Sequence, residues 1–239
     1  MEVKVLLLGH KGMLGHMVVK YLITQNVHVV TTKHRYPSIE FQEELTSFDG
    51  NYIINCIGSI PQRTSDFLLN YELPIWLEKN TSTKIIHPGT DCEMDDDGYG
   101  ISKKKARDFI INKGTHTKIL KTSIIGPELN SNVSLMGWFL SQEDEVGGYT
   151  KALWNGNTTL EWSKECFNLI KKWDDYLIEN ILEGTCVSKF ELLTYIKEVF
   201  NKDINIIPND NVIVDKCLKG NIITPHIKSQ LEELRKYNG

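Results

Sequence analysis

The chain has 239 residues, of which 41% are hydrophobic and 24% charged, and its formal net charge is −4. These values are typical of folded soluble proteins and exclude a collagen-like, disordered or coiled-coil chain. The acidic balance argues against a nucleic-acid partner, because such proteins neutralise phosphates with a basic surface. No apolar stretch approaches the length of a membrane span and the N-terminus lacks a signal-peptide pattern, so we expect a cytoplasmic protein without a membrane partner.

The first half of the chain alternates short apolar runs with helical patterns. The expected strands cover residues 3–8, 27–32, 52–56, 84–87 and 118–121, and the expected helices cover 13–23, 68–79 and 99–112. Strands with almost no polar alternation are typical of a parallel sheet that is buried on both faces. The order therefore predicts an α/β fold with a doubly wound parallel sheet.

The alternation loosens after residue 126. Helical patterns cover residues 133–140, 159–170 and 188–200 and the C-terminus, and a stretch around Trp154 is rich in Trp and Gly. We predict that residues 1–126 form a Rossmann-like nucleotide-binding domain. Residues 127–239 are expected to form mainly a small substrate-binding cap, with some elements returning to the sheet.

The cysteines are scattered and form no Cys-x-x-Cys pair; they are Cys56, Cys92, Cys166, Cys186 and Cys217. This pattern predicts reduced thiols and neither a disulfide framework nor a structural zinc site. No cluster of His, Asp and Glu has the spacing of metal ligands, so we expect no bound metal.

A glycine-rich turn joins the first strand to the first helix. Its cofactor-binding candidates are Gly9, Lys11, Gly12, Met13, Leu14 and Gly15. Glycines at this spacing let the backbone approach a pyrophosphate, and the helix N-terminus supplies unpaired N–H groups. We therefore predict a dinucleotide site, with a tight turn that binds no ligand as the alternative.

The second strand carries no acidic residue at its end, where an Asp or Glu would bind the ribose of NAD. Lys33 and Arg35 follow it instead. Together with Lys11 they would surround a 2′-phosphate, which favours NADPH and leaves NADH as the alternative. The competing interpretation is that Lys33 and Arg35 are ordinary surface cations.

Tyr99 and Lys103 are four residues apart, so they lie one turn apart on the same face of the predicted helix. A phenol with its ordinary pKa near 10 exchanges protons poorly at neutral pH, and a neighbouring ammonium would stabilise the phenolate. Thr90 follows the strand at 84–87, at the edge of the sheet where such folds bind ligands. Its hydroxyl could bind a substrate carbonyl oxygen beside Tyr99.

Several stretches together resemble the extended short-chain dehydrogenases/reductases, in particular the dTDP-4-dehydrorhamnose reductase-like branch. They are Gly9-x-x-Gly12-x-x-Gly15, Asn55-Cys56-Ile57-Gly58, Asn70 ahead of Leu73-Pro74, Gly89-Thr90-Asp91-Cys92, Tyr99-Gly100-Ile101-Ser102-Lys103 and Lys121-Thr122-Ser123-Ile124-Ile125-Gly126-Pro127. The similarity extends weakly through the second half, and the turn at residues 9–13 is also similar to that of GDP-fucose synthases.

The resemblance implies an NADPH-dependent reductase of a 4-keto-6-deoxy sugar nucleotide, which would serve deoxysugar and polysaccharide synthesis. In it, Tyr99 protonates the nascent alkoxide, Lys103 lowers the pKa of Tyr99 and holds the nicotinamide ribose, and Thr90 orients the carbonyl. Further cofactor-binding candidates are Cys56, Ile57, Gly58, Asn70, Thr122, Ser123 and Ile125. The substrate-binding candidates are Asp91, Trp138, Trp154, Asn157 and Thr158.

The chain departs from the family pattern in one important place. Tyr99 follows Thr90 by only nine positions, where relatives carry a longer loop with substrate contacts, and the acidic run at residues 95–97 replaces that loop. An epimerase or epimerase/reductase and a non-catalytic regulatory subunit, like that of methionine adenosyltransferase, therefore remain alternatives. Cys92 is the nearest candidate for an additional base. A homodimer is consistent with the superfamily, but the sequence does not decide it.

Overall fold

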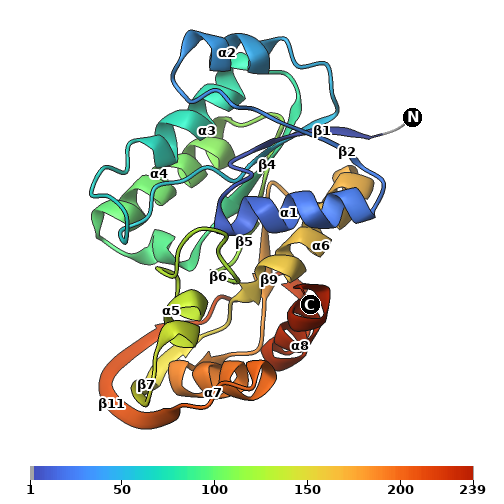
Figure 1. Cartoon of the computed structure of the whole chain (residues 1–239). Coiled ribbons are helices and arrows are strands. Elements are labelled where there is room, and N and C mark those ends of the chain that lie inside the picture. Colours follow the sequence, from blue (N-terminus) through green and yellow to red (C-terminus); the bar gives the residue numbers. More distant parts are fainter. Residues whose placement is uncertain (1–2, 239) are drawn as a thin grey trace.

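The computed structural model describes residues 3–238 and contains a seven-stranded parallel sheet. Its strand order is β12-β9-β5-β4-β3-β1-β2 (Figure 1). The strands are β1 (Lys4–Leu8), β2 (His28–Thr31), β3 (Tyr52–Asn55), β4 (Lys84–Gly89), β5 (Thr117–Lys121), β9 (Glu179–Glu183) and β12 (Ile222–Ile223). The apolar runs of the first half thus form parallel strands, which are largely buried except for the edge strand β2, and the expected α/β fold class is confirmed.

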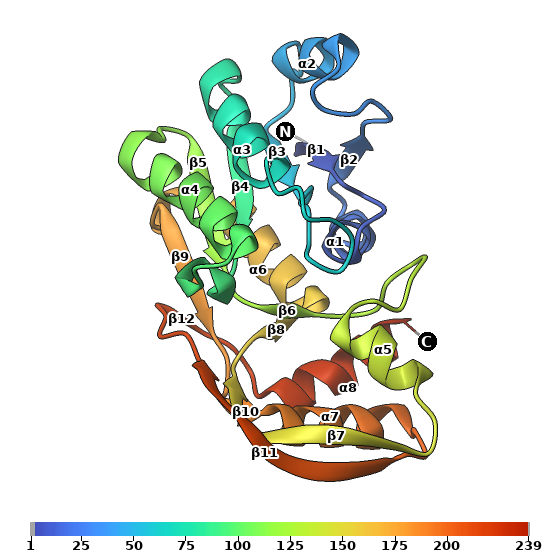
Figure 2. The same cartoon turned by 90° about the vertical axis from the view of Figure 1, so that its left-hand side faces the viewer.

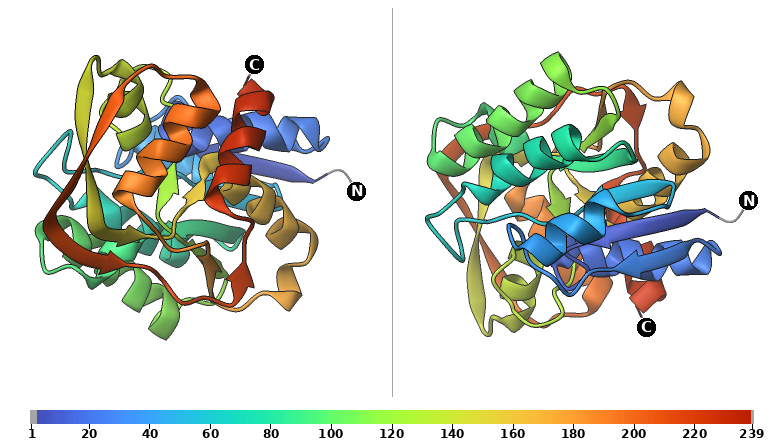
Figure 3. Two further views of the ribbon diagram at one scale, coloured as in Figure 1. Left: turned by 90° about the horizontal axis from the view of Figure 1, so that it is seen from below. Right: turned by 90° about the horizontal axis from the view of Figure 1, so that it is seen from above.

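Helices cover both faces of this sheet. The first face carries α1 (Met13–Thr24) and α6 (Thr159–Lys171), and the second carries α2 (Ile39–Thr46), α3 (Leu69–Asn80) and α4 (Gly98–Lys113). Alternate strand residues point to opposite faces, so Leu7 packs with the core that includes Trp162 of α6, whereas Leu6 packs with the core that includes Phe41 of α2. Viewed from above, α3 and α4 lie side by side (Figure 3).

A second body packs below the sheet, and we call it the C-terminal body. It consists of α5 (Leu135–Ser141), β7 (Glu145–Trp154), β10 (Val187–Ser188), α7 (Lys189–Phe200), β11 (Asn205–Lys216) and α8 (Ile227–Asn238). β7 and β11 run parallel as a long ribbon beside α7 (Figure 2). A separate hydrophobic core joins these elements and includes Trp154, Leu193 and Leu231, and it reaches Met17 of α1.

The chain crosses between the two bodies more than once. A short parallel pair, β6 (Ile124–Ile125) with β8 (Asn157–Thr158), lies at the crossing. From there α6, β9 and β12 return to the sheet. Single-turn 3₁₀ helices are η1 (Asp91–Met94), directly after β4, and η2 (Trp173–Asp175). No helix within residues 3–238 is both long and apolar enough to cross a membrane.

Two cysteines correct the expectation of reduced thiols. Cys186 and Cys217 form a disulfide, with their Cα atoms 5.8 Å apart, whereas Cys56, Cys92 and Cys166 are free. The partners are separated by 31 residues in sequence. They meet because β10 and β11 flank β7, and the neighbours of both cysteines pair with Trp154. The spacing of cysteines along the chain could not show this pairing.

Candidate functional site

The glycine turn after β1 has the geometry of a phosphate-binding loop. Gly9 has a φ of +79°, a conformation that L side chains rarely adopt. A Cβ on Gly15 would lie 2.2 Å from the Gly9 carbonyl oxygen, so that glycine lets the helix pack closely on the strand. A Cβ on Gly12 would meet only the Gly9 carbonyl oxygen, at 3.4 Å, and no side chain caps the first turn of α1. The space outside Gly12 and the uncapped N–H groups fit a pyrophosphate.

The turn lies where the strand order reverses. From β1 the chain continues to β2 on one side, whereas β3 lies on the other, and ligands of open α/β sheets bind at such switch points. Cys56, Ile57 and Gly58 follow β3 at this point, and the Cys56 carbonyl oxygen would be 2.8 Å from a Cβ on Gly9. The structure therefore brings these three cofactor-binding candidates together with the glycine turn.

Asn70 joins this loop to the helix that carries Tyr99. Its side-chain oxygen accepts a hydrogen bond from the backbone N–H of Ser59 at 2.7 Å, and its side-chain nitrogen donates to the Ser102 hydroxyl at 3.0 Å. Ser102 in turn donates to the Tyr99 carbonyl oxygen at 2.6 Å. Because Asn70 is 2% exposed and fully engaged, it positions the loop and α4. The sequence pattern did not indicate that Ser102 links Asn70 to the Tyr99 backbone.

Lys33 and Arg35 lie just beyond the end of β2, and both are exposed, as is Lys11. The structure also brings an acidic residue to this strand end, which the sequence pattern did not reveal. The buried Thr32 hydroxyl donates a hydrogen bond to the Glu44 carboxylate of α2 at 2.5 Å. That contact fixes α2 against the strand end and uses one carboxylate oxygen of Glu44.

Thr90 follows β4 and is the N-cap of η1. Its hydroxyl donates to the Asp91 carboxylate at 3.0 Å and accepts from the backbone N–H of Cys92 at 3.3 Å. Its backbone N–H donates to the Glu93 carboxylate at 3.0 Å. These contacts fix the orientation of the Thr90 side chain at the carboxyl edge of the sheet, which is also the edge of the glycine turn.

Tyr99 lies in the first turn of α4, beside this segment. Its ring packs edge-on against Phe67, with the ring centroids 5.8 Å apart. Burial raises the pKa of the Tyr99 phenol well above its ordinary value, the nearby Cys92 and Asp91 raise it further, and a hydrogen bond with Thr90 opposes the increase. The phenol therefore keeps its proton at neutral pH and is suited to act as an acid.

Lys103 follows one turn later and is 8% exposed. Its ammonium donates a hydrogen bond to the Pro88 carbonyl oxygen at 2.9 Å. Burial lowers the pKa of Lys103, and the nearby Glu93 and Cys56 oppose that decrease. That Lys103 lowers the pKa of the Tyr99 phenol stays a prediction.

Glu93, which accepts a hydrogen bond from the Thr90 backbone, belongs to a buried ion-pair network. The sequence pattern did not indicate this network. The Lys121 ammonium lies 2.6 Å from Oε2 of Glu93, and the two side chains are 8% and 3% exposed. Oε2 of Glu93 accepts no hydrogen bond within the described residues, so its contact with Lys121 is an ion pair. Arg107 lies 3.6 Å from the same carboxylate oxygen and binds Glu179 through two hydrogen bonds at 2.5 and 2.7 Å.

Thr122, Ser123 and Ile125 follow β5 and cross toward the C-terminal body. Thr122 and Ile125 are 2% and 3% exposed. The Thr122 hydroxyl donates to the Ser123 carbonyl oxygen at 3.2 Å and accepts from the Asn157 amide at 2.8 Å. The backbone of this segment therefore reaches the region of the site, whereas the Thr122 hydroxyl is already engaged within the protein.

The four aromatic and polar candidates of the second half are placed unequally. Trp138 of α5 is 37% exposed, whereas Trp154 at the end of β7 is 3% exposed and belongs to the core. Asn157 is fully buried and bonds to protein groups through both ends of its amide. Thr158 is the N-cap of α6, and its hydroxyl accepts from Glu161. The side chains of Asn157 and Thr158 are thus engaged within the protein, and a contact of either with substrate stays a prediction.

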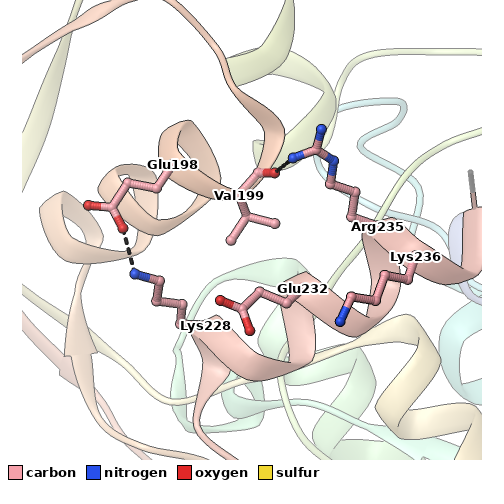
Figure 4. A pocket seen from close by; sticks show the side chains of 6 residues that line it. All are labelled: Glu198, Val199, Lys228, Glu232, Arg235 and Lys236. Atoms are coloured by element: carbon pink, nitrogen blue, oxygen red, sulfur yellow. Dashed lines mark hydrogen bonds and ion pairs between the residues drawn. The ribbon is translucent and has the colours of Figure 1, made fainter.

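One cavity lies away from this site. It has a volume of about 750 Å³ and lies between α7 and α8 (Figure 4). Its lining residues are Glu198, Val199, Lys228, Glu232, Arg235 and Lys236. Lys228 pairs with Glu198 at 2.7 Å, and Arg235 donates to the Val199 carbonyl oxygen. Because these polar groups satisfy one another and none belongs to the sheet edge, we do not assign the chemistry to this cavity.

The sequence matches no protein-family model and no curated protein, whereas solved structures match the whole fold. A dTDP-4-dehydrorhamnose reductase from Bacillus anthracis in complex with NADP has a TM-score of 0.75 at 16% identity, over 99% of both chains. A UDP-N-acetylglucosamine 4-epimerase from Bacillus cereus has a TM-score of 0.77 at 15% identity, over 98% of this chain and 96% of that chain.

A third structure is GDP-mannoheptose C4 reductase from Campylobacter jejuni with NADP bound. It has a TM-score of 0.69 at 11% identity, over 99% of this chain and 98% of that chain. At these identities the likeness concerns the fold. The chain therefore has the Rossmann-like fold of these nucleotide-sugar reductases and epimerases, over nearly its full length.

Proposed function

We propose that the protein is an NADPH-dependent reductase of a nucleotide-activated keto sugar, with a 4-keto-6-deoxy sugar as the first candidate. One observation carries the proposal. Thr90, Tyr99 and Lys103 lie together at the sheet edge that also carries the glycine turn, and the Tyr99 phenol keeps its proton. Structures with this fold include reductases of nucleotide sugars whose crystals contain NADP or NADPH, which supports the same reaction class.

The chain offers a suitable site for the cofactor. Gly9, Gly12 and Gly15 leave room for the pyrophosphate, and the residues after β3 line the neighbouring switch point. Lys33 and Arg35 would bind the 2′-phosphate, because they are exposed cations beyond the end of β2. Bound NADPH would supply the hydride to the keto carbon.

The protein residues would manage the charge that develops on the carbonyl oxygen. Tyr99 would donate its phenolic proton to that oxygen, and the Thr90 hydroxyl would turn from Asp91 to donate a hydrogen bond to it. Lys103 would stabilise the phenolate that Tyr99 becomes, and its ammonium is held near the sheet edge by the Pro88 carbonyl. Asn70 positions both the loop after β3 and the start of α4.

An epimerase that needs an additional base is less favoured. The nearest candidate for that base is Cys92. Burial and the neighbouring Asp91 carboxylate raise the pKa of its thiol to about 12. The thiol donates to that carboxylate, with the sulfur 3.7 Å from Oδ1. A neutral thiol at pH 7 is a poor base. A 4-epimerase transfers a hydride from the sugar to the cofactor and back, so it needs no additional base. One structure of the same fold is a 4-epimerase. Analysis of the products therefore decides between a reductase and a 4-epimerase.

The test has two stages. The purified protein is titrated with NADPH and with NADH, and NADPH oxidation is then followed with a panel of 4-keto-6-deoxy sugar nucleotides that differ in nucleotide base. Tight NADPH binding with stoichiometric oxidation establishes the reductase. A 4-epimerase is identified separately, by a changed configuration at C4 when the protein with NAD⁺ or NADP⁺ is incubated with 4-hydroxy nucleotide sugars. Binding of NADPH without conversion in either assay favours the regulatory alternative.

A further inference from the structure

Lys189 is a partly buried cation at the start of α7. Its ammonium lies 4.7 Å from the centre of the Trp154 ring, in the geometry of a cation–π contact. Trp154 is the last residue of β7 and is 3% exposed. Its ring packs so closely on Gly156 that a Cβ at that glycine would collide with the ring and with the Ser123 carbonyl oxygen. The packing therefore places Lys189 over a fixed ring, close to the segment that follows β5.

Lys189 also lies near the catalytic candidates. Lys216 lies opposite Trp154 in the pairing of β11 with β7, and its ammonium pairs with Asp95 in the segment that follows Thr90. The Lys189 ammonium over the Trp154 ring is therefore close to that segment, and Asp91 and Cys92 of the segment act on its charge. The same two residues act on the Tyr99 phenol. Lys189 and Tyr99 thus approach one turn of the chain from different bodies, Lys189 from the C-terminal body and Tyr99 from the sheet.

The lysines around Lys189 have anionic partners. Lys216 pairs with Asp95, and Lys121 pairs with Glu93. Within residues 3–238, the Lys189 ammonium has no hydrogen-bond acceptor and no ion-pair partner inside contact distance. An ammonium that is largely removed from water and lacks an acceptor is destabilised, and an anionic oxygen would relieve that cost.

We propose that Lys189 binds the diphosphate of the nucleotide sugar and thereby anchors the substrate in front of Tyr99. This inference rests on the proposed function, which supplies the diphosphate. The anomeric diphosphate and the 4-keto carbon lie on opposite sides of a hexose ring. A cation from the C-terminal body and a phenol from the sheet can therefore hold the two ends of one sugar.

The same position gives the anchor a pH dependence. Burial lowers the pKa of Lys189 to about 8, and Asp91 and Cys92 oppose that decrease. The remaining ionisable groups on the elements around it are engaged: Glu191 with Ser188, Lys216 with Asp95, and Asp215 with the Cys217 N–H. Only the ammonium binds an anion, so affinity for the diphosphate should fall as the pH rises through about 8. An Arg at this position stays charged and should remove that fall.

The experiment measures binding rather than turnover. Dissociation constants for dTDP-glucose, UDP-glucose and GDP-mannose are measured by calorimetry with NADPH present, in the wild-type protein and in Lys189→Met, Lys189→Gln and Lys189→Arg. These sugars have no keto group, so the reduced cofactor has no carbonyl to reduce. We expect Met and Gln to weaken the best-bound probe by about 10- to 100-fold, as for loss of a charged hydrogen bond, and Arg to restore most of the affinity at pH 7.

Lys219→Met is the matched control, because it removes one positive charge from an ammonium that is 91% exposed. Lys219→Met should leave the affinity for the nucleotide sugar unchanged. The Lys189 variants should bind NADPH and thymidine, which lacks phosphate, as tightly as the wild type does. Equal affinities in wild type and Lys189→Met, or the same loss for thymidine, would overturn the anchor and leave the reductase proposal intact. A wild-type protein that binds NADPH but no nucleotide sugar would overturn the substrate class and the anchor together.

Discussion

A Cβ on Gly15 would lie 2.2 Å from the carbonyl oxygen of Gly9, whereas a Cβ on Gly12 would meet that oxygen at 3.4 Å. The first distance is a collision with backbone, and the second is a close but tolerable contact. Two glycines of one motif therefore have separable roles: Gly15 allows the fold, and Gly12 leaves space for the ligand.

This difference predicts opposite phenotypes for two alanine variants. Gly15→Ala should lower the free energy of unfolding by at least about 2 kcal/mol, because backbone must move. Gly12→Ala should stay within about 1 kcal/mol of the wild type and weaken NADPH at least about tenfold, because the methyl group occupies the place of a phosphate. Urea unfolding and NADPH fluorescence titration measure the two effects. Equal NADPH affinity in Gly12→Ala would remove the pyrophosphate from this turn.

Lys33 and Arg35 predict a preference for one cofactor. Replacing both with Ala should weaken NADPH about 10- to 100-fold and leave NADH within a few-fold, because only NADPH carries the 2′-phosphate. The control is Lys151→Ala with Lys219→Ala, which removes the same charge from exposed positions away from the end of β2. If NADPH and NADH lose affinity equally, these cations act on the adenosine or on the fold and not on the phosphate.

The disulfide between Cys186 and Cys217 predicts a measurable stabilisation. Closing a loop of 31 residues lowers the entropy of the unfolded chain and should contribute about 3–4 kcal/mol. Cys186→Ser with Cys217→Ser, or reduction of the wild type, should lower the unfolding free energy by that order. The Cys92→Ser variant is the control, because that thiol is free. No change in stability on reduction would show that the two thiols are unpaired in solution.

The sequence predicted the sheet well where the strands are buried. Apolar runs such as residues 3–8 and 52–56 have few polar interruptions, and the strand that begins at Lys84 is longer than predicted only at its end. By contrast, β11 is a 12-residue strand whose side chains are almost all exposed, so hydrophobic pattern could not mark it. The short helix α2 was missed for a similar reason, since only Phe41 and Leu45 are buried in it.

The parts of the candidate site that could be predicted from the sequence are those made by residues close together along the chain. Motifs confined to one turn of the chain, such as the glycine turn and Tyr99 with Lys103, are visible in sequence because their spacing is local. Contacts between distant segments are not visible, and these include Lys121 with Glu93, Asn157 with Thr224 and Lys189 with Trp154. The partners of the Asn157 side chain, Thr122, Thr224 and Gln230, could not be predicted for the same reason, because they lie far along the chain.

The acidic run that replaces the expected substrate loop also has an assigned structure. Asp97 caps α4 by accepting from the Gly100 N–H at 2.6 Å, and Asp95 pairs with Lys216 of β11. The short connection is therefore tied to the C-terminal body instead of forming a free loop. Since Asp95 is neutralised, the repulsion of an anionic substrate by this run is smaller than its sequence implies.

The central claim is that Tyr99 donates the proton in a reduction that uses NADPH. The most direct measurement compares wild type and Tyr99→Phe in NADPH binding and in NADPH oxidation with 4-keto-6-deoxy sugar nucleotides. The account predicts turnover in the wild type, a loss of at least about 100-fold in Tyr99→Phe, and NADPH affinities within a few-fold of each other. Turnover that survives unchanged in Tyr99→Phe would contradict it.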